Sequence, residues 1–417
     1  MFLNEGMKVN GDRLWRTIVE LGEIGGNGHG GVTRLSLSQE ELLGRSYIAS
    51  LMEEAGLEVR RDEAGNVIGR LPGPKPEAPV VVTGSHIDTV REGGRFDGAL
   101  GVLAGIEVLR TMKEQGLAHH RPLEVICFTD EEGVRFGTGY LGSRALVGQW
   151  NDAWLSLTDQ DGVTLRQAMA GAGLSPADAA FARRRPEDVH AYVELHIEQG
   201  RVLEHLGLQV GIATAIYGHR WLSITIKGQA DHGGTTPMEI RRDAMAAASE
   251  AILRIEQSAI DHGGVATVGN LQVKPGSINV IPGEVTFTVD VRHGEGHGLN
   301  RLASEIEAAV AECAGRRDVA VSITVTDADE PVQASEHIIG VIQEACKEAG
   351  YASFMMNCGA GHDAVAMHAV TDIGLILVRS KDGISHHSAE WSTPEDCVAG
   401  ANVLLHTLYA LSHSLTT

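Results

Sequence analysis

Short apolar runs alternate with helical segments through the first half of the chain, and this alternation restricts the fold more than any other feature. Residues 80–83, 123–129 and 191–197 are largely apolar runs of strand length. Residues 98–113 carry leucine and isoleucine at three-residue steps, which is typical of a helix. Residues 11–56 are predicted to be helical around a glycine-rich interruption. Strands that alternate with helices predict a parallel α/β sheet, in which ligands bind beyond the C-terminal strand ends.

A different pattern begins near residue 212. Residues 221–227, 285–292 and 319–325 alternate between apolar and polar side chains. Such alternation indicates an antiparallel sheet with one face in solvent. Helical stretches at 238–258 and 299–314 lie between these strands. The resulting order predicts a two-layer α+β module with a four-stranded antiparallel sheet and two helices.

The α/β pattern resumes late in the chain, with a helix predicted at 336–349 and a strand at 374–378. We therefore expect an α/β fold with one discontinuous domain over residues 1–211 and 328–417. Its sheet is predicted to be mixed and mostly parallel. The α+β module, residues 212–327, is predicted to be inserted into that domain.

The bulk composition narrows the class of protein. A length of 417 residues suggests two or three domains with ample hydrophobic core. The formal net charge of −21 argues against a nucleic-acid partner, because no basic excess is present to meet phosphates. An anionic substrate would therefore need its own local cationic group.

The cysteines and the N-terminus bear on the compartment. No Cys-x-x-Cys pair occurs, so a cysteine metal site is not expected, and reduced thiols fit a cytoplasm. The first fifteen residues lack the apolar region of a secretory signal, and no run of 18 apolar residues is present. We therefore expect a cytoplasmic protein without a membrane partner.

Histidines and carboxylates gather where the predicted strands end. His86, Glu131, Glu132 and His196 lie at or just beyond such ends. Zinc and similar ions bind imidazole and carboxylate ligands, and hydrolytic sites often hold two ions roughly 3.5–4 Å apart. The candidate metal ligands are His86, Asp97, Glu132, His196 and His386.

Three of the nearby acids allow more than one interpretation. Asp88 lies two residues from His86 and could either orient its imidazole or cap the following turn. Glu131 and Glu132 point opposite ways in an extended chain, so one can hold metal while the other handles a proton. Alternatively, both are solvated acids in a loop.

Six segments, in order along nearly the whole chain, carry a specific resemblance. They are His86–Thr89, Phe96–Gly98, Thr129–Gly133, Glu194–Gly200, Gly361–Ala364 and Ile384–His386. Together they resemble the amidase branch of the M20 metallohydrolases, which contains N-carbamoyl-L-amino acid hydrolases, allantoate amidohydrolases, ureidoglycolate hydrolases and β-ureidopropionases. Related exopeptidases and deacylases usually carry an acidic ligand where this chain has His196, so His196 favours the amidase branch.

The resemblance implies a site with two divalent metal ions, which could be Zn, Mn, Co or Ni. By that resemblance His86 and His196 bind one ion, Glu132 and His386 bind the other, and Asp97 bridges them. Glu131 would be the general base, and Asp88 would support the site. His387 remains an alternative to His386, because the family pattern is Ser-His followed by a variable residue.

The inserted module also carries segments that resemble the family. Residues 231–238 resemble its lid motif, although alanine is commoner than glycine at position 233. His232 would stabilise the oxyanion of the tetrahedral intermediate, reaching into the site of a partner subunit. Arg292 would bind the substrate carboxylate through its two-pronged guanidinium, or it is a solvated strand residue. Asn279 lies in a second segment, residues 277–283, that resembles the carboxylate-binding elements, or it is a turn residue next to Pro282.

Further substrate contacts are expected from the same resemblance, at Gln199, His219, Gly359, Gly361 and His362. The family usually dimerises through the inserted module, so a homodimer through residues 212–327 is expected. The implied partner is a small carboxylate that bears a ureido group.

The favoured function is hydrolysis of the carbamoyl group of N-carbamoyl-L-amino acids, giving the L-amino acid, carbon dioxide and ammonia. Allantoate or ureidoglycolate hydrolysis is an alternative with the same machinery. An exopeptidase or N-acyl deacylase, and a metal-free binding protein, are alternatives of other classes. The sequence contains neither a Gly-x-Ser-x-Gly motif nor a glycine-rich phosphate loop, which disfavours serine hydrolases and nucleotide-binding proteins.

Overall fold

The computed structural model describes residues 6–413, which form two compact units. The first contains residues up to Thr214, together with Ala334–Met356 and the residues from Ala360 onward. The second contains Ala215–Gln333 and Asn357–Gly359. Each unit has its own cluster of buried apolar side chains, as expected of separately packed domains.

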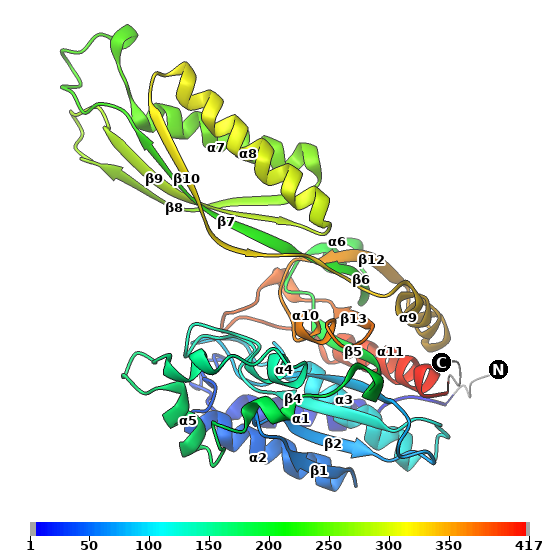
Figure 1. Cartoon of the computed structure of the whole chain (residues 1–417). Helices are drawn as coiled ribbons and strands as arrows, with labels where there is room; N and C mark the ends of the chain where they lie inside the picture. The colour runs from blue at the N-terminus through cyan, green and yellow to red at the C-terminus, as the bar shows by residue number, and fades with distance from the viewer. Residues whose placement is uncertain (1–5, 414–417) are drawn as a thin grey trace. The chain divides into compact units, whose positions relative to one another are not determined.

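The larger sheet is mixed, with a parallel centre. Within residues 6–413 its strand order is β1-β2-β4-β3-β5-β13-β6-β11, and β12 also pairs with β6 (Figure 1). The strands are β1 (Glu58–Arg61), β2 (Val67–Leu71), β3 (Val80–His86), β4 (Leu123–Phe128), β5 (Val189–Ile197), β6 (Val210–Ile216), β11 (Val332–Gln333), β12 (Ser353–Cys358) and β13 (Ile373–Val378).

The four central strands, β4, β3, β5 and β13, run parallel. Antiparallel pairs flank them on both sides. Every residue of β3, β4 and β13 is buried, because parallel strands of this kind are covered on both faces. The predicted mixed α/β sheet with parallel strands is confirmed.

Nine α-helices belong to the described part of the first unit. They are α1 (Gly11–Glu23), α2 (Gln39–Glu54), α3 (Ala99–Glu114), α4 (Leu141–Leu146), α5 (Leu165–Gly171), α6 (Val202–Leu206), α9 (Glu336–Ala349), α10 (Ala364–Met367) and α11 (Pro394–His413). Short 3-10 helices occur at Asp152–Ser156, Ala179–Ala182, Pro186–Asp188 and Lys381–Gly383. Helix α3 is buried along most of its length, with side chains of α1 and α11 in the same core.

The second unit is a two-layer α+β structure. Its sheet, in the order β10-β7-β9-β8, is antiparallel throughout. Helices α7 and α8 lie side by side on one face (Figure 1). The elements are β7 (Gly218–Lys227), a 3-10 helix (Met238–Ile240), α7 (Ala244–His262), β8 (Val265–Lys274), β9 (Glu284–His293), α8 (Gly296–Arg316) and β10 (Ala320–Asp329).

Alternate residues of β7 and β9 form the core of this second unit. Leu222, Ile224 and Ile226 are buried against the helices, as are Val285 and Phe287. The predicted four-stranded antiparallel sheet is confirmed, and it follows from strict period-two burial.

Two predicted helices begin or end elsewhere in the structure. The helix expected from residue 238 starts at Ala244, because the side chain of Asp243 caps it by accepting the N–H groups of Met245 and Ala246. The interruption between the first two helices extends to Ser38, which caps α2 by accepting the N–H of Glu41. A side-chain cap determines each start, so apolar periodicity alone placed them wrongly.

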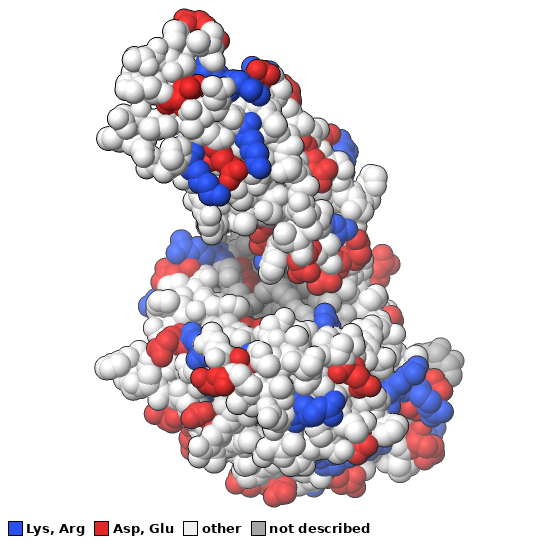
Figure 2. All heavy atoms as spheres, turned by 60° about the vertical axis from the view of Figure 1, so that its left-hand side comes forward, with Lys and Arg blue, Asp and Glu red and all other residues white. Residues whose placement is uncertain are grey.

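The surface drawn in Figure 2 carries basic and acidic side chains interspersed, rather than one continuous basic area. Among residues 6–413, no helix has both the length and the apolar character needed to cross a membrane.

Candidate metal centre

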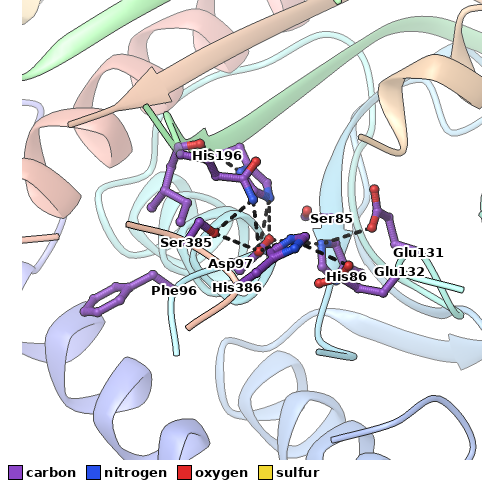
Figure 3. A network of polar contacts seen from close by, with 12 residues as sticks. Ser85, His86, Phe96, Asp97, Glu131, Glu132, His196, Ser385 and His386 are labelled. Carbon is purple, nitrogen blue, oxygen red and sulfur yellow. Dashed lines mark hydrogen bonds and ion pairs between the residues drawn. The ribbon is translucent and has the colours of Figure 1, made fainter. Parts of the chain in front are cut away.

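Three predicted ligands, His86, Glu132 and His196, and the predicted general base Glu131 lie at the C-terminal ends of three parallel strands. His86 is the last residue of β3, Glu131 and Glu132 follow β4, and His196 lies at the end of β5. Because β3 pairs with both β4 and β5, these three ends are adjacent. Asp97 lies in the loop before α3. Figure 3 shows all five side chains directed into one cluster.

Asp97 occupies the centre of that cluster (Figure 3). Its Oδ1 lies 3.2 Å from Nε2 of His196 and 3.6 Å from Nε2 of His86. Its Oδ2 lies 3.2 Å from Nε2 of His386, which is itself 3.7 Å from Oε2 of Glu132. The two oxygens of Asp97 therefore face different imidazoles, as expected of a carboxylate that bridges two metal sites.

Within residues 6–413, three overlapping groups of side chains could each hold a metal ion. They are His86 with Asp97 and His196, His86 with Glu131 and Glu132, and Asp97 with Glu132 and His386. The ligand atoms of each group lie within 4.8 Å of one another. The first and third groups share Asp97 and together contain all five predicted ligands.

Backbone carbonyls orient the two buried imidazoles. Nδ1 of His86 donates to the carbonyl of Asp88 at 2.9 Å, and Nδ1 of His196 donates to the carbonyl of Ile197 at 3.0 Å. Each ring therefore turns its Nε2 toward the cluster, which is the usual arrangement of a metal-binding histidine. Gly98 is required beside His86, because a Cβ there would lie 2.4 Å from the ring and φ is +62°.

The carboxylate of Asp88 holds the turn that carries the two glutamates. Its Oδ1 accepts the N–H of Glu131 at 3.2 Å, and its Oδ2 accepts the N–H of Glu132 at 3.1 Å. The same carboxylate is 3.7 Å from Nδ1 of His86, beyond hydrogen-bond distance. Asp88 thus contacts the turn through its side chain and the imidazole through its backbone.

The cluster gathers buried negative charge that a cation would compensate. Burial raises the pKa of Glu131 well above its ordinary value, His86 opposes this shift and Glu132 adds to it. Burial and the neighbouring Asp97 raise the pKa of Glu132 to about 7. Oε1 of Glu132 is buried without a hydrogen-bond partner. The donor set and the orphaned oxygen fit a divalent ion.

The structure brings His386, rather than His387, into the cluster. His386 has a left-handed backbone with φ of +55°, and its side chain is partly exposed. A hydrogen bond with Asp97 raises the pKa of His386 to about 9. Nδ1 of His387 instead accepts the N–H of Ala389 at 3.0 Å.

Gln199 supports Asp97 directly. Its Nε2 donates to Oδ2 of Asp97 and to Oγ of Ser385, both at 3.0 Å. Its Oε1 is buried without a hydrogen-bond partner. Gln199 was predicted as a substrate contact, and in the structure its amide nitrogen binds the central carboxylate.

Sequence reasoning did not find Glu390, which is buried beneath the cluster. Its Oε1 accepts the N–H groups of Phe96 and Asp97, and its Oε2 accepts the hydroxyl of Ser385 at 2.8 Å. Glu390 therefore joins two loops that carry ligands. Its position four residues after His386 gives no local signal of this role.

Two other predicted substrate contacts are His362, which lies close to a ligand of the cluster, and its neighbour Gly361. The imidazole of His362 is buried, with its centroid 4.2 Å from that of His196. Gly361 lies against Tyr140, where a Cβ would be 2.0 Å from the phenol oxygen. Glycine is therefore needed at position 361 for close approach of the two segments.

Two predicted substrate contacts of the second unit, His219 and Arg292, are paired on the neighbouring strands β7 and β9. Arg292 donates through Nη2 to Asp290 at 2.8 Å and through Nη1 to the carbonyl of Gly359 at 2.7 Å. Nε2 of His219 lies 3.0 Å from Oδ2 of Asp327. The guanidinium of Arg292 is thus held within its own unit by Asp290 and Gly359.

His232 and Asn279 lie on neighbouring exposed segments of the second unit. The carbonyl of Asn279 accepts the N–H of Gly233 at 2.8 Å, and His232 forms an isolated bridge with Val280. These two predicted residues are therefore brought together by backbone pairing.

Known proteins resemble this chain over nearly its full length. An N-carbamoyl-L-amino acid amidohydrolase of Geobacillus stearothermophilus is 49% identical, covering 97% of this chain and 99% of that protein. An allantoate amidohydrolase of Escherichia coli (strain K12) is 35% identical, covering 95% and 97%. The crystal structure of an amidase of the hydantoinase/carbamoylase family from Burkholderia multivorans is 38% identical, with a TM-score of 0.93 and coverage of 98% and 100%.

The family model described as peptidase family M20/M25/M40 matches residues 82–410, which contain every side chain of the metal cluster. This chain therefore belongs to peptidase family M20/M25/M40.

Proposed function

We propose that this protein is a metal-dependent amidohydrolase that removes the carbamoyl group from N-carbamoyl-L-amino acids. The products are the L-amino acid, carbon dioxide and ammonia. The observation that carries the proposal is the pair of ligand groups that share Asp97 and include His196. The relative at 49% identity bears the name of this activity, which supports it over allantoate hydrolysis, named for a relative at 35%.

The cluster would hold two divalent ions. His86 and His196 would hold one, Glu132 and His386 would hold the other, and Asp97 would be shared by both. When bound, such ions polarise the ureido carbonyl and make water nucleophilic near neutral pH.

Glu131 is the proposed general base. Its Oε2 lies 3.7 Å from Nε2 of His86, so the carboxylate is adjacent to the ligands. Glu131 takes a proton from the attacking water and delivers it to the departing nitrogen. Asp88 fixes the backbone of Glu131 and keeps the carboxylate in reach. Glu132 is assigned as the ligand because it also lies near His386.

The second unit is proposed to act as a lid and dimerisation domain. His232 would donate a hydrogen bond to the oxyanion in the site of a partner subunit, and Arg292 with Asn279 would bind the substrate carboxylate. Further substrate contacts are proposed at His219, Gly359, Gly361, His362 and Gln199. The five cysteines are all free and buried, which suits a reducing compartment such as the cytoplasm.

Ammonia release from the metal-loaded protein tests the proposal. The panel contains N-carbamoyl-L-methionine, its D-enantiomer, allantoate, ureidoglycolate, N-carbamoyl-β-alanine, N-acetyl-L-methionine and a dipeptide, the last two followed by free amine. We expect L-selective hydrolysis of the carbamoyl amino acids, abolished by a chelator and restored by metal. A preference for allantoate would change the assigned substrate but leave the proposed mechanism unchanged. Activity confined to the acetyl compound or the dipeptide would overturn the proposal.

A further inference from the structure

The turn that carries His232 is held by the side chain of Arg241. Nε of Arg241 donates to the carbonyl of Thr236 at 3.0 Å, and Nη2 donates to the carbonyl of Gly233 at 2.6 Å. The carbonyl of His232 accepts the N–H groups of Thr235 at 3.3 Å and Thr236 at 3.2 Å, which forms the turn. The guanidinium of Arg241 therefore links two backbone carbonyls of an exposed turn, those of Gly233 and Thr236.

The imidazole of His232 has a defined tautomer within this turn. The N–H of Gly234 donates to Nδ1 of His232 at 3.1 Å. An Nδ1 that accepts a hydrogen bond carries a lone pair, so the neutral ring has its proton on Nε2. His232 is exposed and therefore presents one N–H donor outward. A preorganised donor of this kind is what stabilises a developing oxyanion.

Hydrogen bonds hold the backbone of the residues that follow Arg241. The carbonyl of the next residue, Arg242, accepts the N–H of Gln229 at 2.8 Å. Asp243 then caps α7 by accepting the N–H of Met245 at 2.9 Å. The backbone on the C-terminal side of Arg241 is thus anchored, and its side chain transmits that anchoring to the turn.

The other side of the turn is held by backbone pairing. Gly233 donates its N–H to Asn279, and Asp231 accepts the N–H of Ile281 at 2.8 Å. Both backbone polar groups of Gly233 are consequently engaged, one by Asn279 and the other by Arg241. Backbone pairing with residues 279–281 therefore holds one side of the turn, whereas the guanidinium of Arg241 binds carbonyls on the other side.

We infer that Arg241 is a positioning residue that acts through His232, an inference that rests on the proposed role of His232 in hydrolysis. Removal of the guanidinium releases two carbonyls of the turn and frees the ring of His232 to leave its orientation. Because the ring acts on charge that develops in the transition state, kcat falls while KM changes little.

Arg242 provides a matched control. It is the next residue and lines the same surface cavity as Arg241, but its Nε donates to the carbonyl of Asp318, away from the turn. Arg242→Ala therefore removes an equal charge from the same neighbourhood without releasing His232.

The test compares steady-state kinetics of R241A, R241K, R242A, H232A and the double variant H232A/R241A on the best substrate of the panel. We expect H232A to lower kcat about 10²-fold or more, as loss of an oxyanion donor does. R241A should lower kcat at least about tenfold by misplacing that donor, and R241K less, since one ammonium can keep one carbonyl. R242A should stay within about twofold of the parent. In the H232A background, R241A should have no further effect, because its target is gone.

Two outcomes overturn the inference and leave the proposed role of His232 intact. An equal loss from R241A with and without His232, accompanied by a lower melting temperature, would show a structural role instead. Full activity of R241A beside an impaired H232A would also overturn it. Full activity of H232A would remove the proposed role of His232 itself.

A readout without turnover keeps the inference testable if the panel shows no activity. The nitrogen-15 signals of the His232 imidazole, identified by their loss in H232A, report its tautomer. R241A should shift them toward a mixture of tautomers, whereas R242A should leave them in place. Unchanged signals in R241A would refute the inference whatever the substrate.

Discussion

Oε1 of Glu390 accepts a hydrogen bond from the backbone N–H of Asp97 at 3.1 Å, although the two residues lie 293 positions apart. The same oxygen accepts the N–H of Phe96 at 2.9 Å, and the other oxygen accepts the hydroxyl of Ser385. One buried carboxylate thus holds the loop of Asp97 against the loop of His386. Two proposed ligands from distant parts of the chain, Asp97 and His386, therefore have loops that are joined through this carboxylate.

Glu390→Ala should weaken metal binding about 10- to 100-fold, the usual cost of losing a group that supports metal ligands. The substitution leaves the N–H groups of Phe96 and Asp97 without their acceptor and removes one of two carboxylate acceptors of the Ser385 hydroxyl, the other being Asp97. Titration of the apo-protein against a competing chelator measures the affinity. Glu390→Gln should lose less, because its carbonyl still accepts. Glu395→Ala, an exposed glutamate at the start of α11, is the control. Equal affinities for E390A and E395A would contradict the expectation.

His386→Ala should remove one of the two proposed ions, whereas His387→Ala should bind as much metal as the parent protein. Nε2 of His386 faces Asp97 and Glu132, but His387 caps its own loop through Ala389. Metal content after gel filtration, measured by atomic emission, distinguishes the two variants. Loss of metal from H387A with full occupancy in H386A would reverse the assignment.

Metal affinity should rise with pH up to about 9. Hydrogen bonding with Asp97 raises the pKa of His386 to about 9, so a proton occupies this ring below that pH in the metal-free protein. Metal binding must displace the proton, and affinity should change about tenfold per pH unit for each proton released. Calorimetry in buffers of different ionisation enthalpy counts the protons. H386A should release fewer than the parent protein, and an unchanged count would contradict this origin.

The Glu131→Gln variant should keep its metal, but its kcat should fall about 10²- to 10⁴-fold, which is the usual contribution of general acid–base catalysis. Glutamine preserves the shape of the side chain and its backbone bond to Asp88, yet cannot accept a proton. Metal content and kcat measured on one preparation separate the two effects. If E131Q lost metal instead, Glu131 would be a ligand, because Glu131, His86 and Glu132 form one of the three groups of side chains that could hold a metal ion.

Local patterns were sufficient for much of the fold. Period-two alternation in residues 221–227 and 285–292 predicted β7 and β9, because each strand packs one face on α7 and α8. The largely apolar run at 123–129 predicted β4, since a strand covered on both faces buries nearly all of its side chains, and its one charged residue, Glu124, is buried with ion pairs to Arg70 and Arg184. The short antiparallel strands β1 and β2 were not predicted. Partners rather than composition define β1, whose side chains are largely exposed.

In the metal cluster, too, some residues could be predicted from local patterns and others could not. His86, Glu131 and His196 could be recognised because each lies at or just beyond the end of a strand, and parallel strands bring their ends to one edge. The family pattern favoured His386 as the ligand, but the adjacent and identical residue type left His387 as an alternative. In the structure His386, which has a left-handed φ of +55°, places its Nε2 3.2 Å from Oδ2 of Asp97.

The sequence by itself determined the residue types, their order and the strand ends at which ligands gather, because periodicity and strand-end chemistry are local properties. Only the tertiary structure revealed Glu390 beneath Asp97, Gln199 bound to that carboxylate and Arg241 closing the turn of His232. A hydrogen bond between distant residues leaves no periodic trace in the chain. Its geometry exists only after the loops have been brought together by packing of the core.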